Sequence, residues 1–437
     1  MARVWEAGIC PQIKGESLDL EKIVIRGGKP LMGDVNISGA KNAAVAILPG
    51  VVLAEGPCII ENVPAISDIA TTVAILQSMG ATVTPITKNT LQIDPTTINC
   101  TDVPHELTKY MRGSYYFIGS ILGRYGEARV ALPGGCNFGV RPIDQHLKGL
   151  EALGAQATIN DDVIHVKADR LIGAHVYFDI VSVGATINVM LAAVKAQGVT
   201  ILENVAKEPH IVDLANFLNS MGADIRGAGT DVIKIHGVEH LGQTEYGIIP
   251  DQIEAGTYMV AAAATGGDVL VSGVIPKHLE SITATLQKAG VQVTEYDEAV
   301  RVKREGPVCK CNVKTLPHPG FPTDMQPQIT ALLSVADGTS IITEGVWDNR
   351  FAYTEQLRKM GADIQVDGRV AVVSGVPALH AAAIQAVDLR AGAAVVIAAL
   401  MTEGTSEISD IRHIERGYEE IISKLRDLGA DIKKVEE

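Results

Sequence analysis

The chain carries an internal repeat with a period of about 70 residues, and this period limits the folds open to it. A short pattern ending a helix-like segment recurs as SMGATV, ALGAQA, SMGADI, KAGVQV, KMGADI and DLGADI. Its glycines are Gly80, Gly154, Gly222, Gly290, Gly361 and Gly429. Each is expected to end a helix, because glycine readily adopts the left-handed conformation that follows a helix C-terminus.

A second set of glycines has the same period and another phase, at positions 56, 126, 198, 267, 338 and 404. Each follows a helix-like segment and precedes a strand-like one, as in TINVMLAAVKAQG. The helical spacing of Ile143, Leu147, Leu150 and Leu153 predicts the other helix of one repeat. The unit is therefore an α+β module with two helices and several strands, used six times.

Modules of this size are too large for a common solenoid, whose repeats run about 20 to 50 residues. A chain of 437 residues also exceeds one ordinary core, so six modules divide naturally into three and three. The segment 241–252 is a plausible crossover between the halves. Aromatic residues make up only 4% of the chain, so the cores must be built from alanine, valine, isoleucine and leucine.

Composition excludes several classes of protein. The net charge of −14 argues against a nucleic-acid partner. No apolar run approaches the roughly 20 residues that span a bilayer, and the charged N-terminus is not a signal peptide, so we expect no membrane insertion. The histidines form no recognisable ligand set, so we expect no metal. The six cysteines are dispersed, so we expect them to be reduced thiols and the protein to be cytoplasmic. They lie at positions 10, 58, 100, 136, 309 and 311.

Cys136 stands in the segment LPGGCNFGVRPIDQH, among three glycines. A buried, inert thiol is the commoner fate of a cysteine. The glycines instead favour a mobile loop, and the nearby Arg141 would favour the thiolate. From the residues alone, the two interpretations are evenly balanced.

Polar residues gather at predicted helix starts. Helix N-termini attract anions, whereas a lysine or arginine there opposes the helix dipole. A cation in such a place is better explained by a bound anion than by stability, although a solvated surface residue is the usual case. Asp251 and Asp388 are most simply helix caps. The positions are Lys41, Asn42, Arg141, Gly184, Asp251, Asp324, Asp388, Arg390 and Arg416.

Five separated motifs, SGAKNAA, LPGGCNFGVRPIDQH, VSVGAT, PHPGFPTDMQPQ and HIERGYE, closely resemble the UDP-N-acetylglucosamine 1-carboxyvinyltransferase family of enolpyruvyl transferases, over residues 22–435. The resemblance implies an α+β, two-domain inside-out α/β barrel with six βαβαββ repeats, three per domain. It also implies transfer of the enolpyruvyl group of phosphoenolpyruvate (PEP) to the 3-hydroxyl of UDP-N-acetylglucosamine (UDP-GlcNAc), without metal or organic cofactor. This reaction is the first committed step of peptidoglycan synthesis.

The resemblance also implies roles for individual residues. Cys136 would protonate PEP and can form a covalent adduct with it, and the same thiol would be the target of fosfomycin. Asp324 would act as the base. PEP would be bound by Lys41, Asn42, Arg141 and Arg416, with Lys41 and Arg416 also catalytic and with Asp388 and Arg390 supporting. UDP-GlcNAc would contact Arg112, Arg141, Pro142, Ile143, Asp144, Gln145, Ser182, Val183, Gly184, Asp324 and Val346.

The implied domains are residues 42–249, which bear the Cys136 loop, and residues 22–41 plus 250–437, with the active site in the cleft between them. Residues 1–21 would be an N-terminal extension. The chain departs from the family at Ile180, where some members carry lysine, and at Trp347, which replaces a smaller aromatic.

Two alternatives remain open at this point. The first is 5-enolpyruvylshikimate-3-phosphate synthase, which shares the fold but lacks the lid thiol. The second is a non-catalytic repeat scaffold, against which the joint presence of Lys41, Cys136, Asp324 and Arg416 argues.

Overall fold

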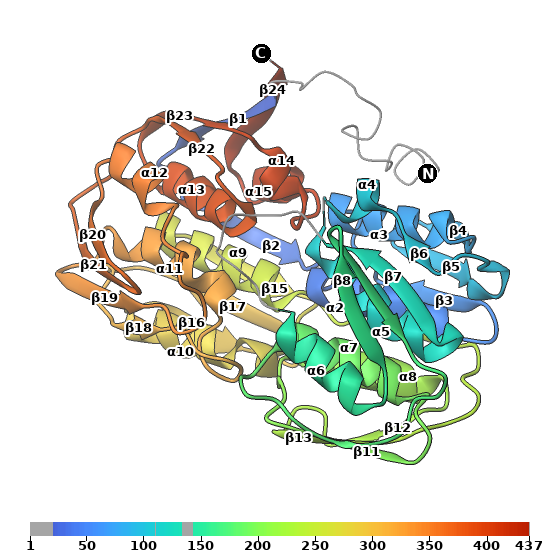
Figure 1. The fold of residues 1–437 in the computed structure, drawn as a ribbon. Coiled ribbons are helices and arrows are strands. Elements are labelled where there is room, and N and C mark those ends of the chain that lie inside the picture. The colour runs from blue at the N-terminus through green and yellow to red at the C-terminus, as the bar shows by residue number, and fades with distance from the viewer. Residues whose placement is uncertain (1–20, 110, 133–142, 437) are drawn as a thin grey trace. The chain divides into compact units, whose positions relative to one another are not determined.

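The computed structural model describes residues 21–109, 111–132 and 143–436. In these residues the repeat forms six four-stranded sheets. Figure 1 shows helices packed against the sheets. Each sheet contains one parallel pair of strands, and its other neighbours are antiparallel. Parallel neighbours need a crossover connection, usually a helix, which explains why helices alternate with the strands.

The described residues divide into two compact units. The first unit lies within residues 39–249 and the second comprises residues 21–38 and 250–436. The break near the N-terminus therefore falls before Gly39, slightly earlier than the expected break after Lys41.

The first unit contains three sheets. In the order of their strands they are β14 (Glu245–Gly247), β3 (Cys58–Glu61), β5 (Thr90–Asp94) and β4 (Thr82–Thr87); β6 (Asp102–Val103), β7 (Glu127–Ala131), β9 (Val163–Lys167) and β8 (Gln156–Asn160); β10 (His175–Tyr177), β11 (Val199–Glu203), β13 (Val232–His236) and β12 (Asp224–Arg226). Its helices are α2 (Lys41–Gly50), α3 (Ser67–Ser78), α4 (His105–Thr108), α5 (Tyr116–Tyr125), α6 (Asp144–Ala152), α7 (Val183–Ala193) and α8 (Pro209–Ser220).

The second unit repeats this plan. Its sheets are β16 (Gln292–Glu295), β17 (Ala299–Lys303), β15 (Asp268–Ser272) and β2 (Met32–Asn36); β18 (Val313–Lys314), β19 (Thr339–Thr343), β21 (Val370–Ser374) and β20 (Asp363–Asp367); β22 (Ala383–Gln385), β23 (Gly404–Ser409), β1 (Glu21–Gly27) and β24 (Asp431–Glu436). Its helices are α9 (Gln252–Thr265), α10 (Glu280–Lys288), α11 (Gln326–Leu333), α12 (Thr354–Lys359), α13 (Leu389–Met401), α14 (Arg412–Glu415) and α15 (Ile421–Asp427).

Some helices lie at the centre of a unit and are buried on nearly every side. They are α2, α5 and α7 in the first unit and α9, α11 and α13 in the second. A helix that is apolar all round belongs in a core, whereas an amphipathic helix such as α8 or α10 covers one face of it. Each unit has its own core, which is built mainly from alanine, valine, isoleucine and leucine, as predicted.

Three sheets are completed by strands from distant parts of the chain. Strand β14 pairs with β3, β2 pairs with β15, and β1 lies between β23 and β24. The repeat pattern alone does not predict these three pairings. The N-terminal strands thereby become part of the second unit's sheets.

The six glycines of the first set all have positive φ, so the predicted helix ends are confirmed. In the second set only Gly126 is itself a left-handed helix cap, and Gly266 takes this role in place of Gly267. Gly198, Gly338 and Gly404 have positive φ, but α7, α11 and α13 end before them, and Gly56 has no positive φ. None of the helices in the described residues is long and apolar enough to span a membrane.

Hydrogen bonds fix the chain on each side of Ile249, where it passes from the first unit to the second. In the first unit Ile249 accepts a hydrogen bond from the Ala40 N–H at 2.7 Å. The buried Asp213 carboxylate accepts from Tyr246 Oη at 2.6 Å and from the Ile249 N–H at 3.3 Å. In the second unit Asp251 donates its N–H to the Ser38 carbonyl at 2.9 Å.

Asp213 makes the stability of the first unit depend on pH. Burial raises the pKa of its carboxyl to about 6, against about 3.9 in an unfolded chain. The folded state therefore holds this proton more tightly between about pH 4 and pH 6, and the free energy of unfolding falls as the pH rises through that window. We expect Asp213→Asn to remove this fall. Urea unfolding of both proteins across the window measures it, and an unchanged pH slope would contradict the assignment.

Candidate active site

Two buried arginines hold the carboxylate of Asp324. Asp324 lies in the 3-10 turn η6 (Thr323–Met325), directly before α11. Arg350 Nη2 lies 3.0 Å from Oδ1, and Arg390 Nη2 lies 3.0 Å from Oδ2. Both arginine side chains are 4% exposed, whereas that of Asp324 is 28% exposed. The carboxylate is thus held by two buried arginines and remains partly exposed.

Arg390 is itself fixed at the start of α13. Asp388 caps this helix and accepts hydrogen bonds from the N–H groups of Arg390 and Ala391, at 2.8 and 2.9 Å. The guanidinium also lies over the Tyr418 ring, 5.5 Å from its centre. Burial alone would lower the pKa of Arg390, but Asp324, Tyr418 and Asp251 together outweigh this effect and the pKa is raised. The side chain is therefore charged, and its buried Nη1 has no hydrogen-bond partner among the described residues.

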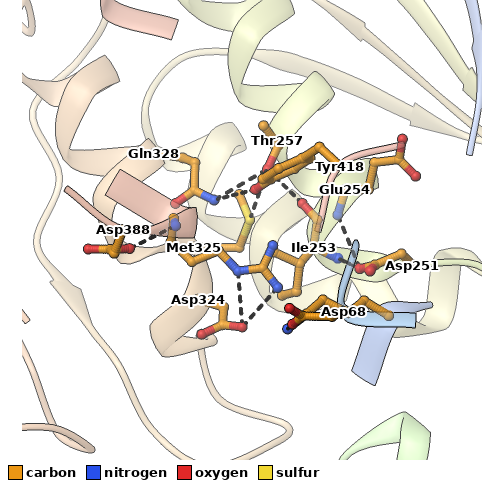
Figure 2. A network of polar contacts seen from close by, with 12 residues as sticks. Asp68, Asp251, Ile253, Glu254, Thr257, Asp324, Met325, Gln328, Asp388 and Tyr418 are labelled. Atoms are coloured by element: carbon orange, nitrogen blue, oxygen red, sulfur yellow. Dashed lines mark hydrogen bonds and ion pairs between the residues drawn. The ribbon is translucent and has the colours of Figure 1, made fainter. Parts of the chain in front are cut away.

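A buried polar network continues from Tyr418 towards α9 and α11 (Figure 2). The Tyr418 and Thr257 hydroxyl oxygens are 3.0 Å apart, and Gln328 Nε2 donates to both at 3.3 Å. Asp251 caps α9 by accepting from the N–H groups of Ile253 and Glu254. The predicted capping roles of Asp251 and Asp388 are therefore confirmed.

Lys41 opens α2 and forms an ion pair with Asp68 in the first turn of α3. Its Nζ lies 3.1 Å from Asp68 Oδ2, and the two side chains are 15% and 6% exposed. Its carboxylate partner comes from a separate helix, so the sequence around Lys41 did not predict it. Asn42 follows Lys41 and is partly exposed.

Gln145 joins the start of α6 to the segment that leads into α7. Its Nε2 donates to Asp179 Oδ2 at 3.1 Å, and its Oε1 accepts from the Asp179 N–H at 2.9 Å. Lys148 Nζ adds an ion pair to Asp179 at 2.8 Å. This arrangement fixes the approach to Ser182, which caps α7 by accepting from the Ala185 N–H at 3.3 Å. The N-termini of α6 and α7 are thereby held together.

Other predicted positions are distributed as follows. Ile143 is the residue before α6, Asp144 is exposed at its start, and Val183 and Gly184 begin α7. The N–H of Val346 donates to the buried Glu344 carboxylate at 2.8 Å. The backbone of Arg112 lies in the 3-10 turn η4 (Arg112–Tyr115). The described residues do not include Cys136, Arg141 or Pro142.

Arg416 requires a correction. Its sequence predicts a position just inside a helix start, but it follows the short helix α14 as its C-terminal cap. The next helix, α15, begins only at Ile421, after Glu420 in the left-handed conformation. A cation at a helix C-terminus suits the helix dipole, so the argument for a bound anion from helix position does not hold for Arg416. For Arg390 the anion is the protein's own Asp324.

Sequence reasoning missed Arg350, Asp68 and Glu344. Arg350 lies in the segment between β19 and α12 and carries no motif that marks it. Asp68 had a weak signal, since an acidic residue after serine is typical of a helix start.

Six four-stranded sheets around buried helices are the fold expected of an enolpyruvyl transferase. A profile of the EPSP synthase (3-phosphoshikimate 1-carboxyvinyltransferase) family matches residues 25–425, and the chain belongs to this family.

Curated relatives narrow the class. A protein named UDP-N-acetylglucosamine 1-carboxyvinyltransferase 3, from Caldanaerobacter subterraneus subsp. tengcongensis, is 60% identical over 96% of this chain and 100% of its own length. The UDP-N-acetylglucosamine 1-carboxyvinyltransferase of Clostridium botulinum is 56% identical over 95% of this chain and 100% of its own length.

Solved structures confirm the predicted fold. The enolpyruvyl transferase NikO from Streptomyces tendae has a TM-score of 0.87 at 26% identity, with 96% of this chain and 100% of that chain covered. EPSP synthase from Acinetobacter baumannii has a TM-score of 0.75 at 17% identity, covering 95% of this chain and 100% of that one, and shares the fold.

Proposed function

We propose that this chain transfers the enolpyruvyl group of PEP to the 3-hydroxyl of UDP-GlcNAc and releases phosphate, as the first committed step of peptidoglycan synthesis. The observation that carries this proposal is the full-length identity of 60% to a protein named for that reaction. Both substrates are phosphorylated metabolites of the cytoplasm, and we propose that the enzyme acts there.

The reaction is an addition followed by an elimination. The acceptor oxygen loses its proton and bonds to C2 of PEP while C3 gains a proton, which gives a tetrahedral phospholactoyl ketal. The bond between C2 and the phosphate oxygen then breaks and C3 loses a proton, which restores the double bond. Both steps need an acid and a base.

We assign the base to Asp324. The support is its position: the two arginines hold the carboxylate and leave it partly exposed. A carboxylate that holds two guanidinium groups is a weaker base than a free one, because both cations stabilise its charge. The base role therefore requires at least one of these contacts to lengthen when the acceptor is bound. The partnerless Nη1 of Arg390 supports a second anion near the same guanidinium.

We assign the acid to Cys136, which can also form the covalent adduct with PEP and with fosfomycin; the support is its glycine-rich segment and the nearby Arg141. PEP carries several negative charges near neutral pH, so it needs several cations. We assign these to Lys41, Arg141 and Arg416, with Asn42 beside Lys41. The UDP-GlcNAc residues are those named from the resemblance above. Among them, Gln145 acts mainly by holding Asp179.

The competing assignment is the shikimate 3-phosphate acceptor of EPSP synthase. We expect phosphate release from PEP with UDP-GlcNAc and none above background with shikimate 3-phosphate. The capped N-terminus of α7 is suited to a diphosphate, and a smaller acceptor would leave its N–H groups unpaired, at about 1 to 3 kcal/mol for each buried group. A colorimetric phosphate assay with each acceptor measures this. Preference for shikimate 3-phosphate would refute the proposal, and so would the absence of release with both acceptors.

A further inference from the structure

His146 is a buried histidine next to the predicted UDP-GlcNAc residues, and no role has been assigned to it so far. It lies in the first turn of α6 and is 8% exposed. Its ring packs at a tilt against Tyr115, with the ring centres 5.8 Å apart. Its Nδ1 lies 2.8 Å from Nδ2 of Asn188, a fully buried residue of α7.

The hydrogen bonds of Asn188 determine where the His146 proton lies. Asn188 Oδ1 accepts from the Gly119 N–H of α5 at 2.8 Å, and a backbone N–H can only donate. The other end of the amide, Nδ2, therefore faces His146 and donates to its Nδ1. Since Nδ1 accepts, the ring is neutral and carries its proton on Nε2. In agreement, burial lowers the pKa of His146 to about 4, with the charge of Asp144 acting in the opposite direction.

The Nε2 edge of the ring lies against the start of α7. A Cβ atom added at Gly184 would come within 2.8 Å of both Cε1 and Nε2, so only glycine fits beside the ring. Asn188 covers the Nδ1 edge of the ring. Nε2 has no hydrogen-bond partner within the described part of the chain. The N–H donor of a buried histidine thus lies against the N-terminus of a helix of eleven residues.

We propose that His146 Nε2–H donates a hydrogen bond to a phosphate oxygen of UDP-GlcNAc bound at the N-terminus of α7, and that Asn188 is the positioning residue that keeps this proton on Nε2. The proposal rests on the proposed function. A helix N-terminus attracts anions, and the Nε2–H beside it can donate a hydrogen bond to a bound anion. Because the ring stays neutral down to about pH 4, the donor is constant throughout the physiological range.

Calorimetric titration with UDP-GlcNAc tests the donor. His146→Leu should raise the Kd about tenfold to a hundredfold, since a hydrogen bond to a charged group is lost. His146→Gln should recover most of the affinity, because its amide nitrogen reaches the place of Nε2. His146→Asn is the matched control that should not recover it, because its shorter amide reaches only the place of Nδ1. A Kd for His146→Leu within twofold of wild type would overturn the proposal.

Asn188→Asp tests the positioning role without changing the size of the side chain. A carboxylate at 188 accepts from Nδ1–H, so the neutral ring would present the Nε2 lone pair to the phosphate, and only the protonated ring would still donate. We expect the UDP-GlcNAc Kd of this variant to rise about tenfold or more from pH 6 to pH 8, while that of the wild type stays flat over the same range. A merely structural role would weaken binding equally at every pH, and this result would overturn the assignment. Failure of the proposed function can be told apart from failure of the His146 proposal, because in the first case the wild type would release no phosphate with UDP-GlcNAc.

Discussion

Asp324→Asn should lower kcat by about 10² to 10⁴, the usual contribution of a positioned general base. The amide is similar in size to the carboxylate but cannot take the proton of the acceptor hydroxyl. Its nitrogen would also face one of the two guanidinium groups that now contact Asp324, so one of those charges loses its partner. We expect UDP-GlcNAc to bind more weakly but still measurably. Steady-state rates with both substrates saturating, together with a direct UDP-GlcNAc titration, separate these effects.

The control is Asp297→Asn, which changes an exposed aspartate of the same unit and should leave kcat unchanged. Melting curves must accompany the rates, because an arginine left buried without its carboxylate costs about 3 to 5 kcal/mol of stability. If folded Asp324→Asn turned over within a factor of three of wild type, Asp324 would not be the base.

Gly119→Ala should destabilise the first unit by about 3 kcal/mol and lower its melting temperature by roughly 10 °C. Gly119 lies where α5 crosses α7, and an added Cβ would come within 2.2 Å of the Asn188 carbonyl oxygen. The obstacle is backbone, so the two helices must separate. Gly123, one turn later on α5, also faces α7, where a Cβ would lie 3.1 Å from the Leu191 carbonyl oxygen. Small residues at both positions allow the close approach.

Hydrogen exchange read on peptides resolves this effect within the chain. Peptides from α5 and α7 should lose protection in Gly119→Ala, whereas peptides from α11 and α13 in the second unit's core should keep theirs. Gly247→Ala is the matched control, since a Cβ there meets nothing within 4 Å. A melting temperature of Gly119→Ala within about 2 °C of wild type would contradict the packing argument.

Local rules in the sequence were sufficient for much of the fold. The period of about 70 residues, the glycines at helix ends and the scarcity of aromatics predicted modules, helix ends and core composition. These features depend on residues close together in the chain. The completion of sheets by β1, β2 and β14 depends instead on residues far apart in the chain. Pairing between strands more than a hundred residues apart cannot be read from the sequence of either strand alone.

The candidate site divides in the same way. The caps of α9 and α13 could be predicted because capping is a local interaction. The partners of Lys41 and Arg390 could not, since Asp68 and Asp324 approach them only in the tertiary structure. Helix position suggested bound anions for these cations, yet the protein supplies a carboxylate to each. The tautomer of His146 likewise depends on Asn188 and Gly119, which come from two other helices.

The central claim is that the acceptor is UDP-GlcNAc, and a competition in one reaction tests it most directly. The protein is incubated with carbon-13-labelled PEP and equal concentrations of UDP-GlcNAc and shikimate 3-phosphate. Mass spectrometry then identifies which product carries the label. The account predicts that the labelled three-carbon unit appears in the sugar nucleotide alone, with one phosphate released for each unit transferred. Label in the shikimate product, or phosphate release without a labelled nucleotide, would contradict it.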